Sequence, residues 1–159
     1  AQARRCYRES VMAAEIHKTE FSLKGRFRSI GAALNGIAVM LRTQHNAWIH
    51  AAATVAVVVA GIAFEVSSAE WCWLILAIAS VWTAEAFNTA LELLTDLASP
   101  SFHPIAGKAK DVAAGAVLIS AIGAACIGAA VLGAHMKSWL ESSGNDARPD
   151  QWIERSATR

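Results

Sequence analysis

The chain has 159 residues, of which 55% are hydrophobic and only 17% are charged. Soluble domains carry about 25% charged residues, so this composition excludes a disordered chain and argues against an ordinary water-soluble enzyme. The net charge of +1 argues against a nucleic-acid-binding protein, and the three cysteines lack the spacing of a disulfide framework or a zinc site.

The apolar residues are concentrated in runs of membrane length. No charged residue lies between Arg42 and Glu65, or between Asp111 and Lys137. Each run supplies the roughly 20 residues that a bilayer-spanning helix needs. A third run, Trp71–Ala84, gives only about 21 Å of helix, which leaves a buried core helix as the alternative. Because a lone core helix between two spans would be topologically odd, we expect an all-α integral membrane protein with three transmembrane helices.

A helical period precedes the first expected span. Apolar residues recur there at three- and four-residue steps: Phe27, Ile30, Leu34, Ile37 and Leu41. This pattern predicts an N-terminal amphipathic helix, either lying on the membrane surface or packed in the bundle. We expect three regions: a cytoplasmic extension over residues 1–24, a three-span domain over 25–137, and a polar, poorly ordered tail over 138–159.

The basic residues indicate how the spans are oriented. Those before the first span are Arg4, Arg5, Arg8, Lys18, Lys24, Arg26, Arg28 and Arg42. The loop after that span has none, whereas the next loop contains Lys108 and Lys110. The positive-inside rule therefore places the N-terminus and the 99–110 loop in the cytoplasm and the C-terminus outside.

Four polar residues lie where the second span should leave the membrane. Glu85, Asn88, Glu92 and Asp96 are spaced 3, 4 and 4 residues apart, which places them on one helix face. Counting from the outer end of the span puts Glu85 roughly 7 Å inside the hydrocarbon. Carboxylates in that position need a divalent cation such as Mg²⁺ or a basic partner, for which Lys110 is the candidate. The alternative is a polar seam that holds the bundle together.

The third span begins after Lys108, Lys110 and Asp111. The lysines could be anchors at the membrane surface, and Asp111 could be the N-cap of a helix that starts at Val112. With the acidic helix face, however, they supply acids for a metal and a cation for phosphate. That combination fits phosphoryl transfer to a lipid. No GxxxxGK[ST] or GxGxxG motif is present, so a nucleotide site would be unusual.

At these residues the chain resembles the prokaryotic diacylglycerol kinase family, which includes the undecaprenol kinases. The resemblance rests on the motifs Glu85-x-x-Asn88-Thr89-Ala90-x-Glu92, Asp96, His103-Pro104, Ala109-Lys110-Asp111 and Ala114-Gly115-Ala116-Val117. It covers roughly residues 27–133. It implies a homotrimer in the bacterial cytoplasmic membrane, with active sites shared between protomers and ATP, Mg²⁺ and a membrane lipid as ligands.

The resemblance also implies roles for individual residues. Glu85 resembles the catalytic base, with Asn88 supporting the site beside it, and Glu92 resembles a ligand of the ATP-bound Mg²⁺. The residues that the resemblance assigns to the nucleotide are Lys110 at the phosphates, Asp111 and Asp96 around the pocket, and Arg26 or Arg28 from the surface helix. Family members often carry a metal-binding Glu where this chain has Gln44, whose amide can ligate a cation but brings no charge.

Three functions remain to be compared. An ATP-dependent lipid kinase acting on diacylglycerol or undecaprenol is the leading interpretation, and the Asn46-x-x-Ile49-His50 segment resembles the undecaprenol kinase branch more closely. A small cation- or proton-conducting bundle is the alternative, although between Trp71 and Thr83 the second span offers only Ser80 as a polar group. A purely structural assembly protein is the third.

Overall fold

The computed structural model describes residues 23–146, which form four α-helices and no strand. The helices are α2 (Leu23–Thr43), α3 (His45–Ala63), α4 (Ser68–Ala98) and α5 (Pro104–Asp146). The residues before 23 and after 146 lie outside this description. The expected extension over residues 1–24 therefore falls almost wholly outside it, as does the end of the tail.

The apolar residues of the predicted amphipathic helix lie on α2. Phe27, Ile30, Leu34 and Ile37 are each between 49% and 73% exposed, so these side chains are uncovered. Residues 26–37 are all exposed, so the amphipathic character of α2 and its place on a membrane surface stay predictions.

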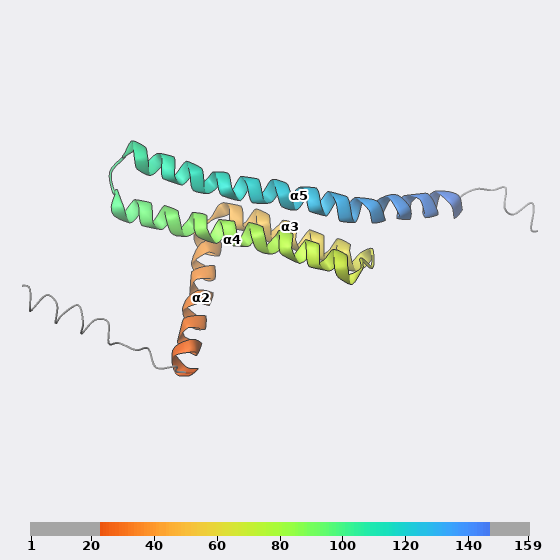
Figure 1. The fold of residues 1–159 in the computed structure, drawn as a ribbon, viewed down its shortest axis with the longest axis horizontal. Helices are drawn as coiled ribbons and strands as arrows, with labels where there is room; N and C mark the ends of the chain where they lie inside the picture. The colour runs from red at the N-terminus through yellow and green to blue at the C-terminus, as the bar shows by residue number, and fades with distance from the viewer. Residues whose placement is uncertain (1–22, 147–159) are drawn as a thin grey trace, which may run out of the picture. The chain divides into compact units, whose positions relative to one another are not determined.

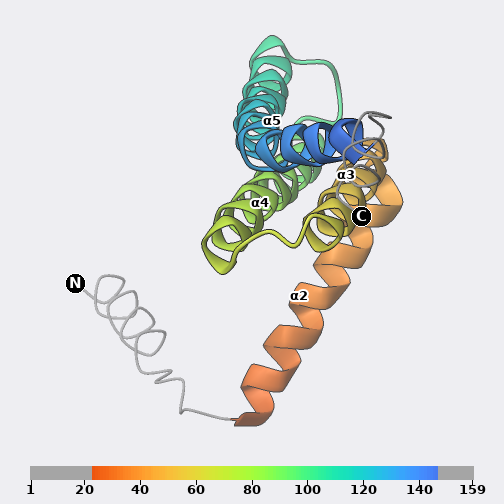
Figure 2. The ribbon, with the colours of Figure 1, turned by 90° about the vertical axis from the view of Figure 1, so that its right-hand side faces the viewer.

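Helices α3, α4 and α5 run side by side, with α4 antiparallel to both of its neighbours (Figure 1). Figure 2 shows the same three helices nearly end on, with the short connection between α3 and α4 toward the viewer. All three are long and apolar enough to cross a membrane, which confirms the expected number of spans. At 31 residues, α4 is about 46 Å long, so the alternative of a short core helix at Trp71–Ala84 is wrong.

Few side chains of the three helices are buried. The buried apolar side chains on α4 are Leu74, Ala77 and Val81, and those on α5 are Ala113 and Val117. Large apolar side chains on all three helices remain exposed, among them Val55, Ile75 and Leu118. Apolar residues on the outside are typical of helices whose surroundings are lipid rather than water.

Several contacts around the connection between α3 and α4 hold the helices together at the end of the bundle that is predicted to lie outside the cytoplasm. Ser67 caps α4 by a reciprocal pair of bonds: its Oγ accepts from the Glu70 amide, and Glu70 Oε2 accepts from the Ser67 amide at 2.8 Å. Glu70 Oε1 also lies 3.0 Å from His135 Nε2 on α5, and the His135 ring stacks on Phe64. One carboxylate therefore ties the start of α4 to the far half of α5.

Helix α5 is longer than the sequence predicted at both ends. It begins at Pro104, a favourable first position because proline lacks the amide hydrogen that a helix start leaves unpaired. The alternative in which Asp111 caps a helix starting at Val112 is therefore wrong, since Asp111 lies inside α5. The poorly ordered tail expected from Ser138 is also wrong as far as Asp146, because the helix continues to that residue.

The tight contact between Gly61 on α3 and Trp71 on α4 predicts a stability effect. A Cβ added at Gly61 would lie 2.8 Å from the indole of Trp71, so Gly61→Ala should lower the thermal midpoint in detergent, equivalent to about 1–3 kcal/mol of overpacking. The matched control is Gly36→Ala on α2, where no atom lies within 4 Å and alanine should be neutral or stabilising. An unchanged or raised midpoint for Gly61→Ala would contradict the described packing of α3 on α4.

Candidate active site

The four polar residues predicted to share a face all lie on α4 and differ steadily in exposure. Glu85 is 0% exposed and Asn88 5%, Glu92 is half-buried, and the side chain of Asp96 is 66% exposed. We call this row the acidic face. It leads from the interior of the bundle to its surface, so one helix carries both enclosed and accessible polar groups.

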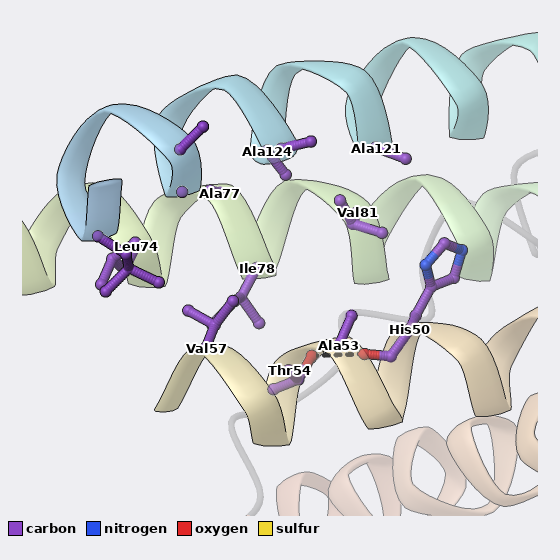
Figure 3. Close-up of a pocket in the computed structure, with 14 residues that line it drawn as sticks. His50, Ala53, Thr54, Val57, Leu74, Ala77, Ile78, Val81, Ala121 and Ala124 are labelled. Atoms are coloured by element: carbon purple, nitrogen blue, oxygen red, sulfur yellow. Dashed lines mark hydrogen bonds between the residues drawn. The ribbon is translucent and has the colours of Figure 1, made fainter. Parts of the chain in front are cut away.

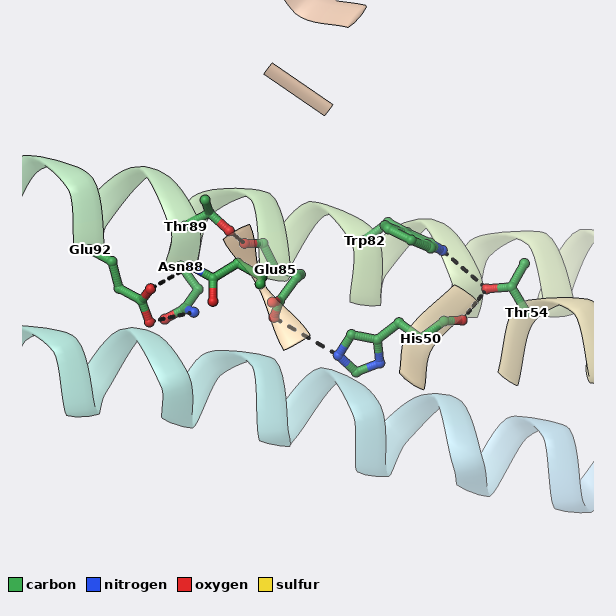
Figure 4. A network of polar contacts seen from close by, with 8 residues as sticks. His50, Thr54, Trp82, Glu85, Asn88, Thr89 and Glu92 are labelled. Atoms are coloured by element: carbon green, nitrogen blue, oxygen red, sulfur yellow. Dashed lines mark hydrogen bonds and ion pairs between the residues drawn. The ribbon is translucent and has the colours of Figure 1, made fainter. Parts of the chain in front are cut away.

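Glu92 is held by two amides. Gln44 Nε2 donates to its Oε2 at 2.6 Å, and Asn88 Nδ2 donates to its Oε1 at 3.1 Å (Figure 4). Gln44 can reach Glu92 because the backbone is extended at this residue, between the end of α2 and the start of α3. The Glu92 carboxylate, which was expected to need a cation, is thus hydrogen-bonded by two neutral amide groups.

Lys110 pairs with the outermost member of the acidic face. Its Nζ lies 2.5 Å from Asp96 Oδ1, and both side chains are accessible, at 37% and 66% exposure. Exposed ion pairs contribute only about 0–1 kcal/mol to stability. The fold therefore does not depend on this pair, and Lys110 can be released to bind an anion. Asp111 is exposed directly after it on α5.

Glu85 faces His50 on α3. Glu85 Oε2 lies 3.9 Å from His50 Nε2, and the two side chains are 1% and 15% exposed. Trp82 Nε1 donates to Thr54 Oγ1 at 3.1 Å, and Thr54 Oγ1 donates to the His50 carbonyl at 2.7 Å. These bonds fix the register of α3 on α4, so that His50 is opposite Glu85 (Figure 4).

Four buried polar atoms have no hydrogen-bond partner among the described residues, and all belong to this cluster: His50 Nε2, both Glu85 carboxylate oxygens and Asn88 Oδ1. A buried polar group left unpaired costs about 1–3 kcal/mol. Such groups are rare in folded proteins, and several in one place indicate a site kept open for a ligand.

An apolar cavity of about 340 Å³ begins at His50 and extends away from the acidic face. Thr54 and Val57 line it from α3, Leu74 and Ile78 from α4, and small residues such as Ala121 and Ala124 from α5 (Figure 3). Its walls are apolar except where His50 and Thr54 stand. The cavity therefore places a hydrophobic volume next to the unpaired polar atoms.

Comparison with known proteins assigns the chain to a family. The family model described as prokaryotic diacylglycerol kinase matches residues 31–132, more than half of the chain. The chain belongs to the prokaryotic diacylglycerol kinase family. It is 40% identical to the undecaprenol kinase of Bacillus subtilis over 111 residues, 70% of this chain and 89% of that protein. It is also 40% identical to a diacylglycerol kinase of Synechocystis sp. over 90 residues, 56% of this chain and 51% of that protein.

Membership of this family confirms the expectation of a phosphotransferase with an alcohol group as acceptor. The matched range contains Gln44, His50, the whole acidic face, Lys110 and Asp111. Arg28 and Arg26 precede it. Both are exposed on the first turns of α2, and their role at the nucleotide stays a prediction.

The described residues fit a magnesium ion that arrives with a nucleotide better than a permanent metal site. No group of three or more His, Cys, Asp or Glu side chains within residues 23–146 could hold an ion alone. Mg²⁺ commonly uses one or two carboxylates and takes its remaining ligands from water and substrate phosphates. Glu92 offers the carboxylate, and the Gln44 and Asn88 amides beside it offer the oxygens for such a partial set.

His50 is the site residue that reasoning from charge patterns missed. It lies within a run that was counted as uncharged, because histidine is taken as neutral at pH 7. The general rule that an ionisable residue inside a membrane span marks a functional site would have singled it out. Its pairing with Glu85 needed the register of α3 on α4, which the sequence alone does not give.

The lack of a hydrogen bond to the Glu85 carboxylate predicts that this residue reduces stability. Replacing a buried carboxyl group without hydrogen bonds by an apolar side chain of similar size removes a penalty of about 1–3 kcal/mol. We therefore expect Glu85→Leu to raise the thermal midpoint in detergent and to abolish kinase activity. Glu141→Leu, an exposed carboxylate near the end of α5, serves as the control and should leave the midpoint nearly unchanged. A lower midpoint for Glu85→Leu would show that the carboxylate has a stabilising partner.

Proposed function

We propose that this protein transfers the γ-phosphoryl group of MgATP to the primary hydroxyl of a membrane lipid, at the cytoplasmic boundary of the bilayer. One observation carries the proposal: a single face of α4 holds a buried Glu85 without a hydrogen bond about three helical turns from a surface carboxylate that is paired with Lys110. The buried end suits a lipid hydroxyl and the surface end suits a nucleotide from the cytosol.

Glu85 acts as the general base. Its unpaired oxygens can accept the proton of the lipid hydroxyl as that oxygen attacks the γ-phosphorus and the bond to the departing ADP breaks. Asn88 Oδ1, also unpaired, is placed to help hold the hydroxyl. The apolar cavity that ends at His50 supports a lipid acceptor, because its walls match a hydrocarbon chain.

The surface end of the acidic face binds the nucleotide. Lys110 would leave Asp96 to contact the phosphates, and Glu92 would hold the ATP-bound Mg²⁺ with the Gln44 amide beside it. Mg²⁺ held there would supply charge neutralisation at the phosphates. Asp111 and Asp96 border the nucleotide, and the family resemblance implies Arg26 or Arg28 as a further nucleotide contact.

We also propose a homotrimer in the bacterial inner membrane, with active sites shared between protomers. The surface of α5 at Gly123 supports close packing with another copy, because this glycine is exposed and a Cβ there would meet no atom within 4 Å. Glycines that leave a helix surface open let neighbouring transmembrane helices approach closely.

The conducting-bundle alternative gains no support from α4. Ser80, its polar group in the middle of the second span, donates to the carbonyl of Ala77 on its own helix at 2.8 Å. A conduction path needs polar groups that are free to bind an ion through the midplane.

Undecaprenol is the first candidate acceptor and diacylglycerol the second. The undecaprenol kinase relative is matched over 89% of its length, against 51% for the diacylglycerol kinase. The Asn46-x-x-Ile49-His50 segment favours the same choice. Offering purified protein both lipids in competition, with ATP labelled at the γ-phosphate, identifies the product directly.

In that assay we expect Glu92→Gln to lower lipid phosphorylation by about 10²-fold or more, because it removes the carboxylate proposed for the metal. Glu141→Gln makes the same chemical change at an exposed site near the end of α5 and should retain wild-type activity. If Glu92→Gln labels lipid as well as the wild type does, the proposed function of this face is wrong.

If the Gln44 amide belongs to the metal site, substitutions at this residue should change the Mg²⁺ concentration that the enzyme needs. Gln44→Glu replaces the 2.6 Å hydrogen bond to Glu92 by two adjacent carboxylates, which repel each other until a cation binds. We expect the Mg²⁺ concentration for half-maximal activity, at fixed ATP, to fall by about threefold or more. Gln44→Met removes the amide without adding charge and should raise that concentration. An unchanged requirement in both variants would exclude Gln44 from the metal site.

A further inference from the structure

His50 and Glu85 form a pair of buried polar groups, each of which lacks a hydrogen bond and faces the other. Their closest atoms, Nε2 and Oε2, are 3.9 Å apart, and no other described group bonds to either atom. Hydrogen bonds of this type have lengths of about 2.7–3.2 Å. A movement of about 1 Å would therefore form one, and catalytic hydrogen bonds are often longer than this before substrate binds.

The position of His50 is determined independently of Glu85. The Trp82–Thr54 bond joins α4 to α3, and the Thr54–His50 bond holds the backbone of the histidine one turn away. Asn88 and Glu92 lie on α4 together with Glu85, whereas the His50 imidazole faces Glu85 from α3 (Figure 4). The carboxylate of Glu85 therefore has one side facing His50, and its other oxygen is left for a substrate.

We propose that His50 is a positioning residue for the catalytic base. Its Nε2–H binds Glu85 Oε2, which orients the carboxylate and leaves Oε1 to receive the proton of the lipid hydroxyl. The hydroxyl oxygen then forms its bond to the γ-phosphorus as the bond from that phosphorus to the β–γ bridging oxygen breaks, and ADP leaves with those electrons. His50 keeps its own proton throughout. This inference rests on the proposed function.

The alternative role of His50 is to bind the lipid, since its side chain also lines the apolar cavity. The two roles differ in kinetics. A residue that orients the base acts on the chemical step and lowers kcat, whereas one that binds the lipid equally before and during transfer raises KM alone.

The test measures lipid phosphorylation by purified full-length His50→Ala, His50→Gln, Glu85→Gln and the double variant His50→Ala/Glu85→Gln. We expect His50→Ala to lower kcat by about 10–100-fold and to change either KM by less than about twofold. His50→Gln, whose amide N–H can replace Nε2–H, should recover most of the loss. The double variant should be no slower than Glu85→Gln, because a positioning residue has no effect once the base is gone.

His135→Ala removes a histidine from the other end of the bundle and controls for general loss of packing, with thermal midpoints measured for every variant. The inference is overturned if His50→Ala raises the KM for lipid at constant kcat. It is also overturned if the losses of the two single variants multiply in the double variant, or if His50→Gln is as impaired as His50→Ala. A wild-type protein inactive on both lipids would instead overturn the proposed function.

Discussion

The buried carboxylate of Glu85 is the constraint around which the site is built. A charged or protonated carboxyl group without hydrogen bonds is unfavourable inside three apolar helices, and the helices cannot move apart to hydrate it without losing their packing. The Trp82–Thr54–His50 bonds hold α3 against α4 at this level, so the carboxylate remains enclosed. The bundle thus maintains an unsatisfied group at the depth where a lipid hydroxyl would lie.

The remaining polar residues follow from the geometry of one helix. Steps of three and four residues carry the acidic face from Glu85 past Glu92 to Asp96, and each step is closer to the surface. The partners change accordingly, from an unbonded histidine through amides to the ammonium group of Lys110. One helix therefore provides a gradient from a buried environment to an accessible one, and the proposed proton transfer and phosphate binding would use its two ends.

Much of this arrangement could be predicted from sequence. Membrane-spanning helices appear as long uncharged runs, and helical spacing places Glu85, Asn88 and Glu92 on one face. Other features could not be predicted. The start of α5 at Pro104 depends on how the loop after α4 closes, and its continuation to Asp146 is not marked by an apolar pattern. The amide bonds of Glu92 and the approach of His50 to Glu85 are contacts between helices, and nothing in local periodicity specifies the register that produces them.

The position of Gln44 suggests how such a site is kept intact without its substrates. A second carboxylate there would leave two like charges side by side at the end of α2 whenever no cation is present. The amide instead donates a hydrogen bond to Glu92, which satisfies this carboxylate without adding charge. In the proposed metal site, this bond would have to break for the amide oxygen to face a cation. Stability without a cation and affinity for one would therefore oppose each other at this position, and the identity of residue 44 would determine their balance.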